Sequence, residues 1–175
     1  MNDPIAVWRS DHEYFRRLLA ALQNEIDRFH AGERPNYELM LDVICYLRDF
    51  CDRIHHPAED AAFGRLVRRA PQLLPLLERL AQEHRIIVHA GEELRAKLSA
   101  VLSDAVVRRG EVEVAAATYL VYYGNHIAKE EEDVLPAAAQ LLTAEDWAAV
   151  RETLPNDTAP SERFRALRRQ IAAEC

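Results

Sequence analysis

The sequence predicts an all-α protein, an antiparallel up-down four-helix bundle with one or two short C-terminal helices. Three observations predict this fold. First, 49% of the 175 residues are hydrophobic and only 5 are glycine, and Ala, Leu, Glu and Arg dominate, as in helical proteins. Second, apolar residues recur with the α-helical period in four long segments. Third, only short breaker stretches separate these segments, so consecutive helices run antiparallel.

Three breaker stretches bound the four long helices. They are HAGERPN (30–36), RRAPQLLP (68–75) and LSDAVVRRGE (102–111), and each contains Gly or Pro. Between them, each segment has one apolar stripe of the kind that an amphipathic helix buries. In chain order, the four stripes consist of Trp8, Phe15, Leu19, Leu22, Ile26 and Phe29; of Leu47, Phe50, Cys51, Ile54, Ala58 and Ala62; of Leu77, Leu80, His84, Ile87, Gly91, Leu94 and Leu98; and of Val112, Ala116, Tyr119, Tyr123, Ile127 and Val134.

Two further helices are predicted after the bundle. TAEDWAAVRETL begins with Thr143 as an N-cap and has Asp146 three residues later, which is typical of a capped helix start. After the break LPNDTAPSE (154–162), the stretch SERFRALRRQIAAE predicts another short helix. We expect a bundle at residues 1–140 and a helical extension at 141–175. The extension would pack on the bundle or on a partner subunit, and in the second case the protein is a homo-oligomer.

Charge and hydropathy exclude several classes of protein. The net charge of -7 argues against a nucleic-acid binder, which needs a basic face. No apolar run approaches the roughly twenty residues needed to span a membrane, and the N-terminus does not resemble a signal peptide, so a cytoplasmic location is expected. Cys45 and Cys51 are roughly 9 Å apart along one predicted helix, which is too far for a disulfide and fits a reducing compartment.

The second helix contains two overlapping pairs of a histidine and an acid, each spaced four apart, within RIHHPAEDAAF (53–63). At about 100° per residue, His55 and Glu59 lie at the edge of the apolar stripe, whereas His56 and Asp60 lie on the opposite side. The first pair is therefore expected to face the core and the second to form a surface pair. On this interpretation, replacing His56 would leave the site nearly intact.

The fourth helix repeats the arrangement. His126 and Glu130 fall within its apolar stripe, while Glu131 and Glu132 rotate outward. Again one pair spaced four apart faces the core. We expect the remaining acids of this run to belong to a solvated face.

Each helix contributes one inward histidine at the same level of the bundle. His84 is central on the inner face of the third helix, and His12 lies at the edge of the inner face of the first. In an antiparallel hairpin, residues equally far from the turn lie side by side. His12 and His55 are nearly equidistant from the first turn, His55 and His84 from the second, and His84 and His126 from the third. The four histidines are therefore expected to meet in one layer.

Such a layer favours a metal site. Four imidazoles and two carboxylates carry a large desolvation penalty as free buried groups, whereas divalent cations satisfy them all. The alternative is a purely structural polar layer. Six ligands exceed what one tetrahedral zinc ion needs and suit two adjacent ions. The candidate ligands are His12, His55, Glu59, His84, His126 and Glu130.

Three residues next to this layer have local consequences. Pro57 lies inside the second helix and removes a backbone donor, so a bend beside the ligands is expected. Cys51 lies one turn before His55, and Tyr123 nearly one turn before His126, so both are candidates to line the site. Their simpler interpretation is as core residues.

The motifs resemble the hemerythrin-like family, also called HHE cation-binding domains, over about residues 5–140. The resemblance rests on His12, HHPAE (55–59), EHR with His84, and HIAKE (126–130). It implies a non-haem di-iron centre with the four histidines as terminal ligands, in which Glu59 and Glu130 bridge the irons together with an oxo or hydroxo group. Manganese and zinc also accept these ligands. Ferritin-like proteins differ, because they use Glu-x-x-His at spacing three.

The chain departs from the oxygen-carrying hemerythrins at one position. Those proteins have a fifth histidine one turn after the third-helix histidine, and here that position is Val88, with His89 one residue too far. The resemblance therefore implies a four-His, two-Glu site with open positions on the metals. These favour binding or sensing of a small diatomic or peroxide ligand such as oxygen, peroxide or nitric oxide.

Several functions are compatible with such a site. The first is a cytoplasmic di-iron protein that binds or senses oxygen or related oxidants. The others are an enzyme of peroxide or nitric-oxide detoxification, an iron donor for the repair of damaged iron–sulfur clusters, and an interaction protein with a structural metal. Repair proteins of similar ligand set usually have an additional N-terminal cysteine-containing domain, which we do not expect here because His12 lies near the start of the sequence.

Overall fold

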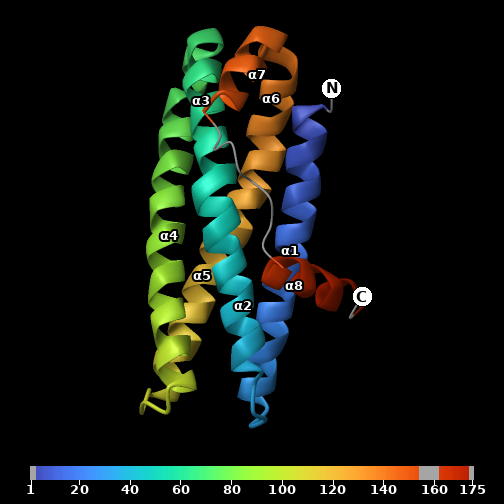
Figure 1. The fold of residues 1–175 in the computed structure, drawn as a ribbon. Helices are drawn as coiled ribbons and strands as arrows, with labels where there is room; N and C mark the ends of the chain where they lie inside the picture. The colour runs from blue at the N-terminus through green and yellow to red at the C-terminus, as the bar shows by residue number, and fades with distance from the viewer. Residues whose placement is uncertain (1–2, 154–161, 174–175) are drawn as a thin grey trace.

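The computed structural model describes residues 3–153 and 162–173, and every regular element within them is helical. The predicted all-α fold is therefore confirmed. Figure 1 shows the arrangement of the helices. The α-helices are α1 (Pro4–His30), α2 (Tyr37–Leu47), α3 (His56–Arg69), α4 (Leu74–Leu102), α5 (Arg109–Lys129), α6 (Leu135–Leu141), α7 (Ala144–Arg151) and α8 (Glu162–Ala173).

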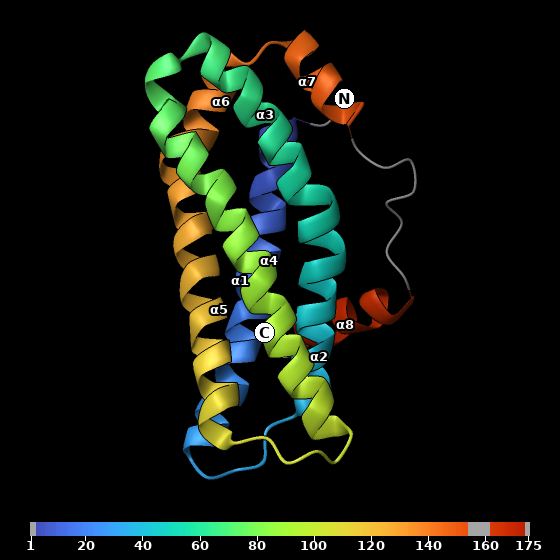
Figure 2. The same ribbon diagram turned by 90° about the vertical axis from the view of Figure 1, so that its left-hand side faces the viewer.

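Four rods form the antiparallel bundle. α1 and α4 are each one rod, while α2 and α3 are joined end to end by a π-helical segment, Arg48–His55. A second π-helical segment, Glu130–Val134, joins α5 to α6 in the same way. In Figures 1 and 2 each joined pair continues as one rod along the bundle. The four long predicted helices thus correspond to the four rods.

Local sequence sets the ends of the first two helices. The Asp3 side chain caps α1 by accepting a hydrogen bond from the Ile5 backbone at 3.1 Å. Asn36 caps α2 by accepting from the Leu39 backbone at 3.0 Å. Between the two helices Gly32 has a φ of 80°, a left-handed conformation that glycine adopts without steric cost. The connection can therefore be short.

Each π-helical segment precedes a proline. Pro57 is the second residue of α3, and Pro136 is the second residue of α6. A proline has no backbone N–H, so the α-helical hydrogen bond to the carbonyl four residues earlier cannot form. A π-helix uses bonds to the residue five positions earlier and has wider turns. Before Pro57 the structure therefore has a stretch in which each residue rotates by less than 100°.

The apolar core is divided into two clusters along the bundle axis. One cluster fills the end that contains the α1–α2 and α4–α5 connections, and includes Phe15, Leu47 and Tyr119. The other fills the opposite end, around Trp8 and Leu80. The level between them is occupied by the buried histidines and glutamates, so the predicted polar layer interrupts the core rather than lying at its edge.

The two predicted C-terminal helices are present. Thr143 and Asp146 form a reciprocal capping box at the start of α7, and the Arg69 guanidinium of α3 donates to Asp146 Oδ2 at 2.7 Å. Trp147 packs edge-on against Trp8 of α1, with ring centroids 5.3 Å apart. α8 lies against α1 and α2 (Figure 1). Residues 154–161 of the predicted break at 154–162 lie outside the described residues, as does the third cysteine, Cys175.

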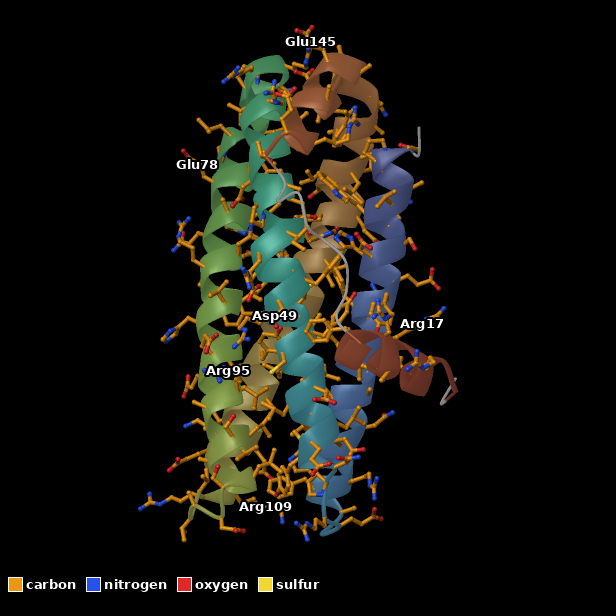
Figure 3. All side chains as sticks on the ribbon, in the orientation of Figure 1. Arg17, Asp49, Glu78, Arg95, Arg109 and Glu145 are labelled. Atoms are coloured by element: carbon orange, nitrogen blue, oxygen red, sulfur yellow. The ribbon has the colours of Figure 1, made fainter. Side chains whose placement is uncertain are left out.

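Charged side chains cover the outside of the bundle. Figure 3 shows Arg17, Glu78 and Glu145 directed away from it. Within the described part of the chain, no helix combines the length and apolar character needed to cross a membrane.

Candidate metal centre

All six predicted ligands lie together at the middle of the bundle. His12 is on α1, His84 on α4 and His126 on α5, and all three are buried. His55 ends the first π-helical segment and Glu130 begins the second, while Glu59 lies on α3. Residues up to 118 positions apart in the sequence thus meet in one layer, because antiparallel rods bring the same level of each helix together.

Glu59 lies between two groups of histidines. Its Oε1 is 3.1 Å from His55 Nε2 and 3.4 Å from His12 Nε2. Its Oε2 is 3.5 Å from His84 Nε2. Because one oxygen faces each group, this carboxylate has the placement required to bridge two cations.

Glu130 makes a similar connection from the opposite rod. Its Oε1 is 3.2 Å from His126 Nε2 and 3.6 Å from His84 Nε2. Its Oε2 is 3.5 Å from His12 Nε2. Each of the two carboxylates therefore has oxygens that face histidines of different rods.

The structure corrects the placement of His56. The sequence predicts a surface residue, but His56 is only 3% exposed, and its ring stacks on that of His84 with centroids 4.2 Å apart. The prediction was wrong because it used a constant 100° per residue through Arg48–His55, which is π-helical. Smaller rotation per residue turns both His55 and His56 inward. Pro57 was the available sequence signal, since it prevents the regular α-helical bond.

The buried donor atoms form two groups. In each group the candidate ligand atoms all lie within 4.8 Å of one another. Glu59 belongs to both, so the groups are adjacent. One group consists of His56, Glu59, His84 and His126, and the other of His12, His55 and Glu59.

Acidic side chains contact the outward nitrogens of the histidines. Asp60 was predicted to pair with His56 at the surface; its side chain is 47% exposed, but its Oδ1 is a hydrogen-bond partner of His84 Nδ1 at 3.0 Å. Glu131, predicted to rotate outward, has its Oε1 3.4 Å from His12 Nδ1 and is paired with Arg16. Further Nδ1 contacts join His55 to Asp11 (3.3 Å), His126 to Glu83 (3.2 Å) and His56 to Asp52 (3.3 Å).

Four of these acids form a closed belt around the bundle. Asp11 of α1 contacts a histidine of the second rod, and Asp60 of the second rod contacts a histidine of α4. Glu83 of α4 contacts a histidine of the fourth rod, and Glu131 of the fourth rod contacts the histidine of α1. Sequence reasoning missed this belt. A signal existed, because each acid is the immediate chain neighbour of a layer residue, as in the dipeptides Asp-His, Glu-Asp, Glu-His and Glu-Glu.

A cation fits the donor atoms that face the centre. Several of these buried atoms have no hydrogen-bond partner among the described residues, including both Glu59 oxygens, Glu130 Oε1 and Nε2 of His84 and His126. Leaving buried polar atoms unpaired costs free energy. Imidazole nitrogens and carboxylate oxygens are suitable ligands for divalent transition metals, and outward carboxylates on the imidazoles are the usual support of a metal-binding histidine.

Comparison with known families agrees with this donor set. The family model described as the hemerythrin HHE cation binding domain matches residues 3–138. The chain belongs to the hemerythrin HHE cation-binding family. No curated protein and no solved structure gives a match to the chain. The sequence-based resemblance is therefore confirmed over the bundle.

The hemerythrin-like layer of this chain holds charge without metal. Burial lowers the pKa of His55, but the Glu59 and Asp11 carboxylates outweigh it and raise the pKa to about 10. Burial likewise opposes charge on His84, yet Asp60, Glu130 and Glu59 raise its pKa to about 11. For Glu59, burial acts to raise the pKa and the surrounding imidazoles lower it well below the usual value. Protonated imidazoles thus balance the negative charge of the carboxylates, which a bound cation would otherwise balance.

The pKa of His56 is shifted in the opposite direction to those of His55, His84 and His126. Burial and the nearby positive charge of His84 lower its pKa well below the ordinary value. A neutral imidazole has a free lone pair and needs no proton removed before it can bind a cation.

Apolar groups and a small pocket surround the layer. Cys51 and Tyr123 are fully buried neighbours on one side of it, and burial raises the pKa of both, so both are neutral. A pocket of about 170 Å³ lies between α1 and the first π-helical segment, where it reaches His55 and is lined by Trp8 and Phe50. Pockets for drug-sized ligands span roughly 300–1,000 Å³. This pocket therefore suits only a small molecule.

Proposed function

We propose that this protein is a non-haem di-iron protein that binds or senses oxygen or a related small oxidant, such as peroxide or nitric oxide. The observation that carries the proposal is the position of Glu59, which has one oxygen facing each of two adjacent donor groups. A shared carboxylate is what two neighbouring cations need. The proposed ligands are His12, His55, Glu59, His84, His126 and Glu130.

Iron is the proposed metal because the proposed function is reaction with an oxidant, which requires a metal that can change its oxidation state. Imidazole and carboxylate ligands accept iron, manganese and zinc alike, so manganese and zinc are expected to bind as substitutes. When bound, a pair of irons supplies electrons to an oxidant, which zinc cannot do.

The residues of the chain have three roles in this proposal. The acidic belt orients the imidazoles, so that each presents Nε2 to the centre. The apolar clusters on both sides exclude water from the layer. The pocket beside Trp8 and His55 provides space for a small ligand next to the layer.

The described cysteines Cys45 and Cys51 are free, which supports the proposed cytoplasmic location.

Metal analysis and spectroscopy test the proposal. Purified protein should contain about two irons per chain, and its visible absorption should change when a reductant and then oxygen are added. His55→Ala should contain less iron than the wild type, because it removes a ligand of one donor group, whereas His89→Ala, which removes an exposed histidine of α4, should retain it all. Protein that binds no metal under iron-replete conditions would refute the proposal.

The same preparation separates binding from the alternative functions. A binding or sensing protein should take up peroxide or nitric oxide once per centre, without steady-state turnover. Sustained turnover that is lost in Glu130→Ala would instead establish a detoxifying enzyme. Transfer of iron to an apo iron–sulfur acceptor would establish an iron donor.

A further inference from the structure

We propose that His56 is a fifth imidazole ligand of the centre. Together with His84 and His126 it would hold one cation, which leaves the cation at His12 and His55 with fewer protein ligands. This inference rests on the proposed dinuclear site and adds to it which half is open to a small ligand.

The first support is the burial of His56 without hydrogen bonds. The residue is 3% exposed, and neither of its ring nitrogens has a hydrogen-bond partner within residues 3–153 and 162–173. A histidine that only fills space in a core normally satisfies its nitrogens, because a buried polar group without a partner destabilises the fold. Its Nε2 therefore indicates a partner that is not a protein group.

The second support is the set of donors around it. His56, Glu59, His84 and His126 have candidate ligand atoms within 4.8 Å of one another. The His56 ring lies parallel to that of His84 and edge-on to that of His126, with centroids 4.2 and 5.8 Å apart. Three imidazoles and a carboxylate are a donor set that transition-metal cations prefer.

The third support is the carboxylate behind the ring. Asp52, one turn earlier on the same rod, has its Oδ1 3.3 Å from His56 Nδ1. The other four histidines of the layer each have an acidic partner at the same ring atom. His56 thus shares the arrangement that orients a metal-binding imidazole, with Nε2 left for the cation.

The two halves of the site are then unequal. The half with His56 has three imidazoles, while the half with His12 and His55 has two. A cation with fewer protein ligands keeps a position for an external molecule. The pocket of about 170 Å³ also reaches His55. The smaller number of protein ligands places the binding of a small oxidant at the His12 and His55 half, and the pocket lies behind it, beside the Asp11 partner of His55 Nδ1.

Titration of the metal-free full-length protein with Co²⁺ tests the ligand assignment. Wild-type protein should bind two equivalents. His56→Phe keeps the ring volume and the stack on His84, and it should weaken one of the two equivalents on the order of 100-fold. The exposed-histidine control His89→Ala should behave as wild type. Should His56→Phe fail to give the wild-type helical circular dichroism, His56→Gln makes the same test with a polar side chain.

The outcomes distinguish this inference from the proposed function. If wild type binds two Co²⁺ and His56→Phe binds both with unchanged affinity, the His56 assignment is wrong while the dinuclear site stands. If wild type binds no metal, both fail together. Mössbauer spectra of the ⁵⁷Fe-loaded wild type should contain two unequal doublets of equal area, and a single doublet would overturn the predicted inequality of the halves.

Discussion

At the scale of single residues, adjacent acids in the chain have different roles in the layer. Glu59 is fully buried with both oxygens toward the centre, while Asp60 is half-exposed and contacts His84 from outside. In the same way Glu130 faces the centre and Glu131 contacts His12. Because consecutive helical residues point in different directions, one helix can both supply a bridge and orient a histidine of the next helix.

Replacing the outer acid is expected to weaken metal binding without abolishing it. The Asp60 charge orients the His84 ring and makes its imidazole more basic. Asp60→Asn removes this charge, so metal affinity should fall roughly 10–100-fold. Competition titration with a chelator of known affinity measures this change. Asp27→Asn, which alters an exposed acid near the end of α1, should have no effect, and an equal loss in both variants would exclude a specific role for Asp60.

Replacing the inner acid should change the number of metals rather than only the affinity. Glu59→Gln keeps the size of the side chain but removes the charge shared by the two donor groups. Two adjacent cations repel each other unless a carboxylate neutralises them, so stoichiometry should fall below two per chain. Elemental analysis after gel filtration measures the ratio. Two tightly bound metals in Glu59→Gln would show that Glu59 does not bridge.

At the scale of elements, periodicity predicts the rods but not their rotation at the site. The stripes and breaker stretches correctly predicted four long helices, their order and the level at which the histidines meet, since these depend on sequence spacing alone. The face of His56 depends on a local change in hydrogen bonding at Arg48–His55. No apolar pattern reports such a change, because it shifts the period over only a few residues.

Removing the proline should alter the site through the helix. In Pro57→Ala a backbone N–H returns, so an α-helical bond to the Arg53 carbonyl becomes available and the π-helical segment is expected to shorten. His55 and His56 would then rotate relative to Glu59, and metal affinity should fall while the metal-free protein remains folded. Co²⁺ titration together with thermal unfolding tests this expectation. Pro75→Ala, near the start of α4, should leave binding unchanged.

At the scale of the whole molecule, the polar layer separates two apolar clusters and contacts all four rods. A cation bound there connects rods that otherwise meet through buried charges. Metal removal should therefore destabilise the whole bundle rather than one loop. At a free metal concentration 100 times the Kd, binding at one site adds about 2.7 kcal/mol, or roughly 5–10 °C in Tm.

Calorimetry with and without a chelator measures this difference. In His55→Ala the chelator should lower the Tm less than in the wild type, because one of the two donor groups is incomplete, whereas His89→Ala should lose stability with the chelator as the wild type does. A Tm of the wild type that does not depend on metal would mean that the cation contributes nothing to the cohesion of the rods.

The C-terminal extension is tied to the bundle near the same layer. Trp147 of α7 packs on Trp8, and Trp8 is in turn edge-on to His55 with centroids 6.0 Å apart. α7 is itself fixed to α3 by Asp146, which accepts hydrogen bonds from Arg69 and from the Thr143 backbone. Asp146 is therefore the residue through which the extension can be loosened without touching the site.

Asp146→Asn should lower the Tm by roughly 2–4 °C at neutral pH. Hydrogen bonds from the Thr143 backbone and side chain, together with Arg69, lower the pKa of Asp146 from 3.8 to about 2. A group whose pKa is lowered in the folded state stabilises the protein when the pH is above its pKa in the unfolded chain. This stabilisation is lost as the pH falls through the folded-state pKa. The difference between wild type and variant should thus be full above pH 4 and vanish near pH 2. Urea unfolding across this range measures it, with Glu145→Gln, an exposed acid on the same helix (Figure 3), as the control. A difference that persists unchanged to pH 2 would show that the ionised carboxylate is not what holds α7 in place.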